Sequence, residues 1–317
     1  MNRIQQQEPV YIYPYVSHEN ERELCHMELR ALFGGFNAEL PYIESARRIA
    51  PNRSPFISLR LDVLFARTRL EDLMVQVAAL SLGASTFKVV YLKCGLSCTY
   101  EEQREAERQI GGCIRGKADM EHPDVTFGLL ASKEGWTLGI CRAANPVWLA
   151  HKHKPHNYST GLTTVTARAL VNIALPDPQG LKAIDPCCGM GNVLIEALSM
   201  GVDIVGRDIN PVAVRGARGN LRHFGYEDTG IVAIQDLKEL QGEYAAAIVD
   251  LPYNLCSVLP PEERRQMLDS IRRISHRAVI VSIELLEEEL RAAGFSIMDR
   301  CVVMKGKFAR RIWLVQR

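Results

Sequence analysis

The sequence lacks long apolar runs, low-complexity tracts and a marked excess of charge of either sign. Its longest apolar stretches, such as residues 245–249 and 278–283, are far shorter than the roughly 18 residues that a membrane-spanning helix needs. Residues 1–7 are mostly polar and lack the apolar core of a signal peptide. Hydrophobic residues make up 47% and charged residues 24% of the chain, which is ordinary globular composition and excludes disordered or collagen-like classes. We therefore expect a globular protein that does not contact a membrane.

The sequence also lacks the cysteine spacing of a metal site. Cys94 and Cys98 are separated by three residues, but no second pair of Cys or His follows at a suitable distance, so we expect no metal. The total of nine cysteines is odd, and free thiols in this number are typical of a reducing compartment. We expect a cytoplasmic protein.

The net charge of +1 does not indicate a polyanionic partner for the chain as a whole. A local exception is the run at residues 151–156, His-Lys-His-Lys-Pro-His. Clustered cations can bind phosphates even on a neutral protein, although such runs are also ordinary in solvated linkers. On charge alone we favour a linker.

A chain of 317 residues has room for about two domains. Its first half mixes predicted strands and helices, which is typical of an α+β domain, here over residues 1–144. The predicted strands are 10–16, 56–65, 86–92, 125–131 and 136–141, and the predicted helices include 70–82 and 99–114. Residues 145–159 are rich in Pro, His and Lys, and we predict a linker there.

Strands and helices alternate regularly in the second half, which predicts a parallel sheet with helices on both faces over residues 160–317. The expected strands are 181–184, 202–206, 231–234, 245–249 and 278–283, followed by an antiparallel hairpin of 296–303 and 308–315. The expected helices are 192–200, 211–224, 261–274 and 285–293. The fold class is therefore α/β, a Rossmann-like, doubly wound sheet with an antiparallel last strand, preceded by an α+β region.

The first motif is a strand that leads through a glycine turn into a helix, at residues 183–192 (Ala-Ile-Asp-Pro-Cys-Cys-Gly-Met-Gly-Asn). Gly189 and Gly191 let a ligand approach the backbone, and the helix start offers unpaired N–H groups. Asp185 ends the strand, and its carboxylate fits a cationic or polyol ligand better than a phosphate. A Gly-x-Gly turn alone is also common for purely steric reasons.

Two further aspartates follow the next predicted strands. Asp208 lies 17 residues after Gly191, where an acid commonly binds the ribose hydroxyls of a nucleotide. A carboxylate that stabilises a helix N-terminus is the alternative. Asp236 follows the third strand and could bind an adenine amino group, or could serve only a turn.

Asp250-Leu251-Pro252-Tyr253 follows the fourth strand, where the crevice of such a sheet opens. A carboxylate and a stiffened backbone can accept hydrogen bonds from an exocyclic amine, and Tyr253 can stack on its base. A turn with a core tyrosine explains the segment equally well by itself. Its register with the other two motifs favours the functional interpretation.

These residues resemble a family. Residues 185–191 are similar to the first motif of class I S-adenosylmethionine-dependent methyltransferases, Asp-Pro-x-Cys-Gly-x-Gly, and residues 250–253 to the Asp/Asn-Pro-Pro-Tyr motif of enzymes that methylate amino nitrogens. Together with Ile195-Glu196-Ala197 and residues 166–172, they resemble the THUMP-domain RNA guanine-N2 methyltransferases, especially those acting on tRNA. The resemblance covers about residues 158–317, and a looser THUMP resemblance is strongest near residues 113–143.

The resemblance implies a role for each matching residue. The residues expected to bind S-adenosylmethionine are Asp185, Gly189 and Gly191 at the methionine moiety, Asp208 at the ribose and Asp236 at the adenine. Cys187 and Asn192 of the same turn are also expected to bind the cofactor. Asp250 and the Leu251 carbonyl would hold the target amine, with Pro252 stiffening the loop and Tyr253 on the base. Two positions depart from the pattern: Leu251 replaces the usual first proline, which predicts a less rigid loop, and Asn192 stands where Ser or Thr is common.

The resemblance implies a ferredoxin-like and THUMP-like RNA-binding region before the catalytic domain, and transfer of a methyl group to the exocyclic N2 of a guanosine in tRNA. Adenine N6 or a protein glutamine remains an alternative target, because the amino-methylating motif is shared. A non-catalytic RNA-binding or cofactor-binding protein is a further alternative, which Leu251 keeps open. The residues leave open the RNA, the nucleotide, the number of methyl groups, the oligomeric state and any helper subunit of the kind some relatives need.

Overall fold

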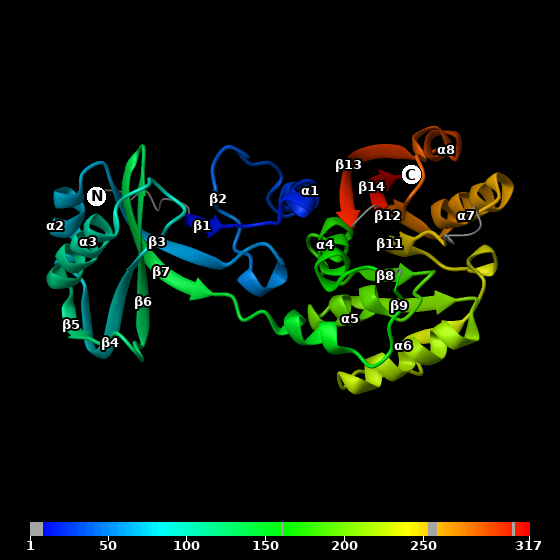
Figure 1. Cartoon of the computed structure of the whole chain (residues 1–317), viewed down its shortest axis with the longest axis horizontal. Coiled ribbons are helices and arrows are strands. Elements are labelled where there is room, and N and C mark those ends of the chain that lie inside the picture. The colour runs from blue at the N-terminus through cyan, green and yellow to red at the C-terminus, as the bar shows by residue number, and fades with distance from the viewer. Residues whose placement is uncertain (1–8, 160, 253–258, 306–307) are drawn as a thin grey trace, which may run out of the picture. The chain divides into compact units, whose positions relative to one another are not determined.

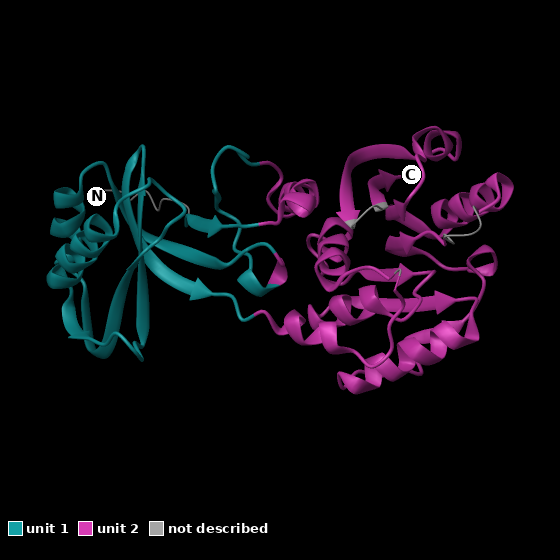
Figure 2. Cartoon of the chain, viewed as in Figure 1, with its two compact units in different colours: residues 1–16, 36–52, 56–145 teal, residues 17–35, 53–55, 146–317 magenta. Residues whose placement is uncertain are grey.

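The computed structural model describes residues 9–159, 161–252, 259–305 and 308–317. It divides into two compact units, drawn in teal and magenta in Figure 2. Unit 1 comprises residues 1–16, 36–52 and 56–145, and unit 2 comprises residues 17–35, 53–55 and 146–317. No helix in the described ranges is long and apolar enough to span a bilayer.

Unit 1 is an α+β fold on one seven-stranded sheet in the order β2-β1-β3-β7-β6-β4-β5 (Figure 1). β4 is parallel to β5 and β6, and the other neighbouring strands are antiparallel. The strands are β1 (Tyr11–Pro14), β2 (Tyr42–Ser45), β3 (Leu59–Arg67), β4 (Ser81–Tyr91), β5 (Arg115–Ala118), β6 (Val125–Ser132) and β7 (Gly135–Ala143). The helices are α2 (Leu70–Val77), α3 (Tyr100–Cys113) and the short 3-10 helix η2 (Pro51–Arg53), whose last residue groups with unit 2.

α2 and α3 cover the sheet of unit 1 through one apolar cluster that includes Leu73, Ile110 and Phe127. α3 begins with a capping box, in which the Thr99 hydroxyl accepts from the Glu102 amide at 3.2 Å and the Glu102 carboxylate accepts from the Thr99 amide at 2.7 Å. Such a box satisfies two backbone N–H groups that a helix start leaves unpaired. The apolar residues Ala106 and Ile110 of this helix pack in the cluster on the sheet, and its charged face stays in solvent.

Unit 2 is built on a second seven-stranded sheet in the order β10-β9-β8-β11-β12-β14-β13, and helices lie on both of its faces (Figure 1). The first five strands are parallel, and β14 is antiparallel to β12 and β13. The strands are β8 (Lys182–Asp185), β9 (Asp203–Asp208), β10 (Val232–Ile234), β11 (Tyr244–Asp250), β12 (Ser275–Ser282), β13 (Ser296–Lys305) and β14 (Phe308–Gln316). The helices are η1 (Glu19–Glu21), α1 (Arg22–Phe33), η3 (Val147–His153), α4 (Thr164–Ala174), α5 (Asn192–Ser199), α6 (Pro211–His223), η4 (Leu237–Glu239), α7 (Pro261–Ile274) and α8 (Glu287–Ala292).

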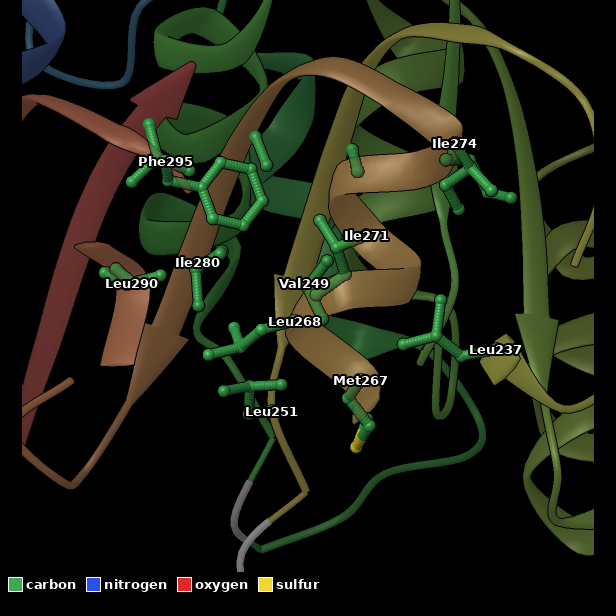
Figure 3. Close-up of a cluster of buried hydrophobic side chains, with 14 of the residues drawn as sticks. Leu237, Val249, Leu251, Met267, Leu268, Ile271, Ile274, Ile280, Leu290 and Phe295 are labelled. Atoms are coloured by element: carbon green, nitrogen blue, oxygen red, sulfur yellow. The ribbon is translucent and has the colours of Figure 1, made fainter. Parts of the chain in front are cut away.

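This sheet confirms the predicted Rossmann-like architecture with an antiparallel last strand. Figure 3 shows an apolar cluster in which α7 packs on β11 and β12. Leu268 and Ile271 of α7 are fully buried against Val249 and Ile280 of the sheet. Full burial of such a side chain contributes about 1.5–3 kcal/mol, so this cluster fixes α7 beside the carboxyl ends of the parallel strands.

The unit boundaries differ from those expected from the sequence, because two segments from the N-terminal half belong to unit 2. α1 contacts α4 and the edge strand β13. The Arg30 guanidinium forms a bidentate ion pair with Asp299, with nitrogen–oxygen distances of 2.8 and 3.0 Å. The Glu23 carboxylate accepts a hydrogen bond from the Val302 amide at 2.8 Å. α1 thus satisfies part of a sheet edge that would otherwise be open to strand pairing.

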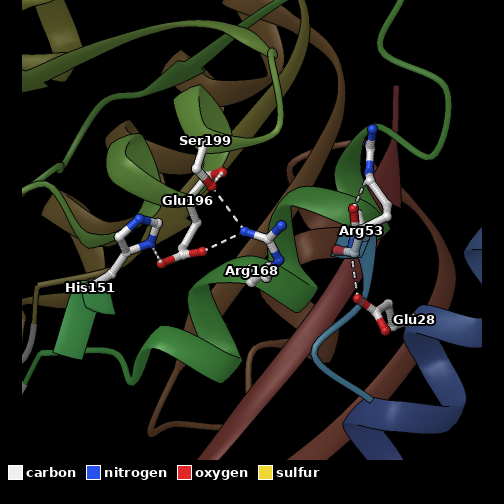
Figure 4. A network of polar contacts seen from close by, with 7 residues as sticks. Glu28, Arg53, His151, Arg168, Glu196 and Ser199 are labelled. Atoms are coloured by element: carbon white, nitrogen blue, oxygen red, sulfur yellow. Dashed lines mark hydrogen bonds and ion pairs between the residues drawn. The ribbon is translucent and has the colours of Figure 1, made fainter. Parts of the chain in front are cut away.

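A buried polar cluster fixes these segments on α4 (Figure 4). The Asn172 amide donates to the Glu28 carboxylate at 2.6 Å, and the Ser54 hydroxyl donates to its other oxygen at 2.5 Å. Arg53 donates to the Asn172 side-chain oxygen at 2.5 Å and to the Leu175 carbonyl at 2.7 Å. Partners on every side explain how the charged and amide groups tolerate complete burial.

The segment predicted as a linker, residues 145–159, is instead anchored in unit 2 from Pro146 onward. Residues 147–153 form η3, in which Trp148 and His151 are buried. His151 Nδ1 lies 2.6 Å from one Glu196 oxygen, and Arg168 donates to the other at 2.8 Å (Figure 4). The prediction failed because a run of Lys and His resembles a solvated linker, while His151 of this run and Trp148 just before it are buried.

We expect Glu28 to make stability depend on pH. Burial raises the pKa of Glu28 from 4.5 to about 7, opposed by the hydrogen bonds from Asn172 and Ser54. Between pH 4.5 and 7 the folded chain retains a proton that the unfolded chain has released, so the free energy of unfolding decreases as pH rises through this window. Glu28→Gln cannot ionise and should become more stable than the unmodified protein by up to about 3 kcal/mol between pH 5 and 8.

Urea unfolding of Glu28→Gln and of the unmodified protein at pH 5 and at pH 8 measures this difference in the free energy of unfolding. Glu19→Gln, which removes an exposed carboxylate from η1, is the matched control and should follow the profile of the unmodified protein. Parallel profiles for Glu28→Gln and the unmodified protein would show that Glu28 is already ionised at pH 5.

Candidate active site

The carboxyl ends of the parallel strands of unit 2 open into a cavity of about 700 Å³. This is the edge where open α/β sheets bind ligands. Nine of the predicted site residues in the described ranges line this cavity: Asp185, Cys187, Gly189, Asn192, Asp208, Asp236, Asp250, Leu251 and Pro252. Gly191 belongs to the same turn but is not among the lining residues. Tyr253 lies outside the described residues.

The glycine turn joins β8 to α5. Gly189 and Gly191 both have positive φ, 51° and 80°, which L side chains rarely adopt. A Cβ on Gly191 would also lie 3.3 Å from the Cβ of Ala217. Asp185 supports the turn from the strand side, because its carboxylate accepts the Cys187 amide at 3.2 Å. Glycine at 191 is therefore needed for both conformation and close packing.

Asp208 ties the end of β9 to this turn. One oxygen of its carboxylate accepts the Gly189 amide at 2.8 Å, and the other accepts the Asn210 amide at 2.9 Å. Each oxygen has two lone pairs, so both can still accept a bond from a ligand hydroxyl. The two interpretations of Asp208, binding of a ribose hydroxyl and support of the backbone at a helix start, are thus compatible.

Asp236 has a visible structural role. It is the N-cap of η4, and its side chain accepts the Lys238 amide at 2.9 Å, while the Lys238 ammonium lies 3.7 Å from its other oxygen. Asp236 and Lys238 both line the cavity. The turn function that the sequence allowed is present, and the role of Asp236 toward an adenine stays a prediction.

Leu251 connects the cavity with the core. Its side chain is buried against Met267 and Leu268 (Figure 3), and its amide donates to the Val281 carbonyl of β12 at 3.0 Å. A proline at 251 could not donate this bond. The sequence predicted a less rigid loop at this departure from the motif, but the backbone here is held by the sheet and the side chain by the core.

Asn192 begins α5, and its amide donates to the Leu162 carbonyl at 2.8 Å. Tyr158, Gly161 and Leu162 also line the cavity. Sequence reasoning missed them because Tyr158 falls in the expected linker, and Gly161 and Leu162 directly follow it without a motif of their own. The glycine was the available signal: a Cβ on Gly161 would lie 3.1 Å from the Asn192 amide nitrogen.

Carboxylates dominate the charge of the cavity. The ends of four neighbouring strands contribute Asp185, Asp208, Asp236 and Asp250, α7 adds Glu263, and Lys238 supplies a cation. Burial raises the pKa of Asp185 well above its usual range, and the carboxylates of Asp208 and Asp250 raise it further. A cationic ligand would relieve this repulsion, so the cavity fits a positively charged cofactor with polar hydroxyl groups.

The two cysteines of the turn are not arranged as nucleophiles. Burial, followed by the nearby Asp185 and Asp208 carboxylates, raises the pKa of the Cys187 and Cys188 thiols well above the usual range. They therefore stay protonated and uncharged, whereas a reactive cysteine needs a lowered pKa. Within the described residues, no group of three or more His, Cys, Asp or Glu side chains is placed to hold a metal ion.

Comparison with known proteins gives a family match within unit 2. A family model described as UPF0020, RMKL-like, methyltransferase domain, matches residues 151–279. A tRNA (guanine(10)-N2)-dimethyltransferase of Methanothermobacter thermautotrophicus is 31% identical over 191 residues, which are 55% of this chain and 55% of that protein. A protein of the same name from Pyrococcus abyssi is 27% identical over 223 residues, 65% of this chain and 66% of that protein. The chain thus spans about half the length of the first relative.

A search of solved structures finds TrmN from Thermus thermophilus, with a TM-score of 0.48 and 18% sequence identity. The match covers 97% of this chain and 99% of that chain.

We expect Asp208→Ala to weaken binding of S-adenosylmethionine by about 1–3 kcal/mol, because the cofactor loses hydrogen bonds to a charged group and the Gly189 amide loses its acceptor. Isothermal titration calorimetry measures the affinity directly. Asp203→Ala, an exposed aspartate at the opposite end of the same strand, is the matched control and should bind like the unmodified protein. Unchanged affinity for Asp208→Ala would remove Asp208 from the cofactor site.

Proposed function

We propose that the chain is an S-adenosylmethionine-dependent RNA methyltransferase, and the match of residues 151–279 to the UPF0020 methyltransferase-domain model supports this proposal. We further propose that its target is the exocyclic N2 of a guanosine in tRNA. The relatives in M. thermautotrophicus and P. abyssi, named as tRNA guanine-N2 dimethyltransferases, support this choice of target.

One observation carries the proposal: Asp250-Leu251-Pro252 and the cofactor-type residues Asp185 and Asp208 line the same cavity. The strand order puts β11 beside β8, and β8 beside β9. An amine held at the end of β11 and a cofactor held at the ends of β8 and β9 therefore share one enclosed space. This is the geometry that a direct transfer between them requires.

S-adenosylmethionine, when bound, supplies an electrophilic methyl group carried on a positively charged sulfur. Asp185 and the glycine turn would hold its methionine part, and Asp208 its ribose. The carboxylates of the cavity are preorganised for this positive charge, since the chain meets the cost of bringing them together when it folds. Displacement at a methyl group is an in-line reaction, so positioning is the main task of these residues.

The target amine is conjugated with its ring and is a poor nucleophile. Asp250 and the Leu251 carbonyl are acceptors for its two N–H groups, and such bonds localise the lone pair and orient it. The bond from the Leu251 amide to the Val281 carbonyl fixes the peptide group between Asp250 and Leu251, and so holds the backbone from which both acceptors project. Asp250 need not be a strong base, because the proton can leave after the methyl group has been transferred. Tyr253 is proposed to stack on the base.

RNA as the substrate class is supported by the N-terminal half of the chain. Unit 1 is an α+β fold of 7 strands with α2 and α3, and we propose that it acts as the THUMP-like RNA-binding module that the sequence resembles.

A methyl-transfer assay with radiolabelled S-adenosylmethionine tests the proposal. The substrate is bulk RNA from cells that lack the gene, and the products are separated as nucleosides by chromatography. Label in N2-methylguanosine from the tRNA fraction is the expected result. Label in N6-methyladenosine, or none in any RNA despite measurable cofactor binding, would overturn the assignment of the target.

We expect Asp250→Ala to retain cofactor affinity and to lose at least about 100-fold in kcat, the scale of removing one preorganised group at a reacting centre. Asp250→Asn keeps an oxygen acceptor and the side-chain volume, and should retain more activity than the alanine variant. Single-turnover transfer and cofactor titration on the same preparations separate chemistry from binding. Normal turnover by Asp250→Ala would exclude Asp250 from the mechanism.

A further inference from the structure

The surface beside the cavity mouth is made of two segments without a single acidic residue. Residues 146–176 and residues 209–226 contain no Asp or Glu, in a chain whose acidic and basic residues nearly balance in total. Both segments reach the cavity: Tyr158 lines it from the first, and Ile209 and Asn210 from the second. The same two segments carry exposed cations, among them Lys152 of η3 and Arg215 of α6.

The two segments are fixed to each other. The Asn220 side chain of α6 accepts the His156 amide and donates to the His156 carbonyl, both at 2.9 Å, and it also donates to the Met190 carbonyl at 2.8 Å. The His151 ring packs on Phe224 with a centroid distance of 4.9 Å. Residues 151–158 are therefore a rigid part of the surface of unit 2.

Glycines in α6 make this contact possible. A Cβ on Gly216 would lie 2.1 Å from the Met190 sulfur, and one on Gly219 would lie 2.7 Å from the His156 ring. Glycine is among the poorest helix formers, so two of them in one helix disfavour it locally. The close packing of residues 151–158 on α6 offsets this cost, as expected if the shape of the surface matters.

The exposed side chains on this surface fit a nucleic-acid strand. Tyr158 and Ile209, which line the cavity, are 43% and 68% exposed, and Val212 in the first turn of α6 is 59% exposed. These side chains offer stacking and apolar contact to unpaired bases. Farther along α6, Arg215 is exposed and pairs with no carboxylate among the residues that the structure describes. Guanidinium and ammonium groups beside apolar contacts are the usual arrangement for phosphates that flank bound bases.

We propose that α6 and residues 151–158, here called the α6 surface, bind the phosphates of the RNA strand whose target nucleotide enters the cavity. This proposal rests on the proposed function. It assigns to the catalytic unit its own share of RNA binding, in addition to any binding by unit 1. Arg215 gives the sharpest test. The other exposed cation, Lys152, interacts electrostatically with Glu21, so removing Lys152 would also change the charge balance around Glu21.

The experiment measures binding of bulk tRNA to the full chain by filter binding between 50 and 200 mM salt, together with methyl transfer. Arg215→Gln should bind tRNA more weakly and lower the slope of log affinity against log salt by about 0.7–0.9, the value for one phosphate contact. Adding Lys152→Gln should lower the slope further. Affinity for S-adenosylmethionine should not change in either variant.

Two controls make the result specific. Arg215→Lys keeps the charge and should keep the slope, and Arg291→Gln removes an exposed guanidinium from α8, outside the α6 surface, and should behave like the unmodified protein. Unchanged slope and affinity in Arg215→Gln, with normal methylation of tRNA, would overturn the α6 surface and leave the proposed function standing. Failure of the unmodified protein to bind or methylate any RNA would overturn both.

Discussion

The hydrogen bond from the Gly189 amide to the Asp208 carboxylate is the constraint on which the site of unit 2 depends. It joins the ends of two neighbouring parallel strands at the point where each turns into its helix. The second oxygen of Asp208 accepts the amide of Asn210, which in turn caps α6. One carboxylate thus holds both the glycine turn before α5 and the start of α6. The cavity and the α6 surface beside it therefore depend on the same side chain.

A tension between core and cavity explains the unusual Leu251. The strands must be apolar where α7 packs on them, and their ends must carry carboxylates. Leu251 stands at the transition: its side chain lies in the core, its amide donates to the neighbouring strand, and the residue is also part of the cavity lining. At a position that is usually proline in the motif, Leu251 therefore stabilises the backbone by burial of its side chain and by a hydrogen bond to the neighbouring strand.

The parts of the structure that follow from local chemistry could be predicted from the sequence. Regular alternation predicted every strand of the unit 2 sheet, and the position of each aspartate at a strand end predicted which side chains the cavity brings together. The predicted helix 70–82 was too long, since α2 ends at Val77 and β4 begins at Ser81, where apolar residues suit either element. Contacts between distant segments, such as Asn172 with Glu28 or Asn220 with His156, leave no local pattern and were missed.

The placement of α1 in unit 2 has a consequence for the order in which the chain can mature during synthesis. Arg30 meets Asp299, a partner 269 residues later in the chain. The surface of β13 that α1 binds is therefore made long after α1 itself. The chain must hold an amphipathic helix without this partner while the intervening residues are synthesised, which is the situation in which nascent proteins depend on chaperones and in which slow, non-local contacts control the folding rate.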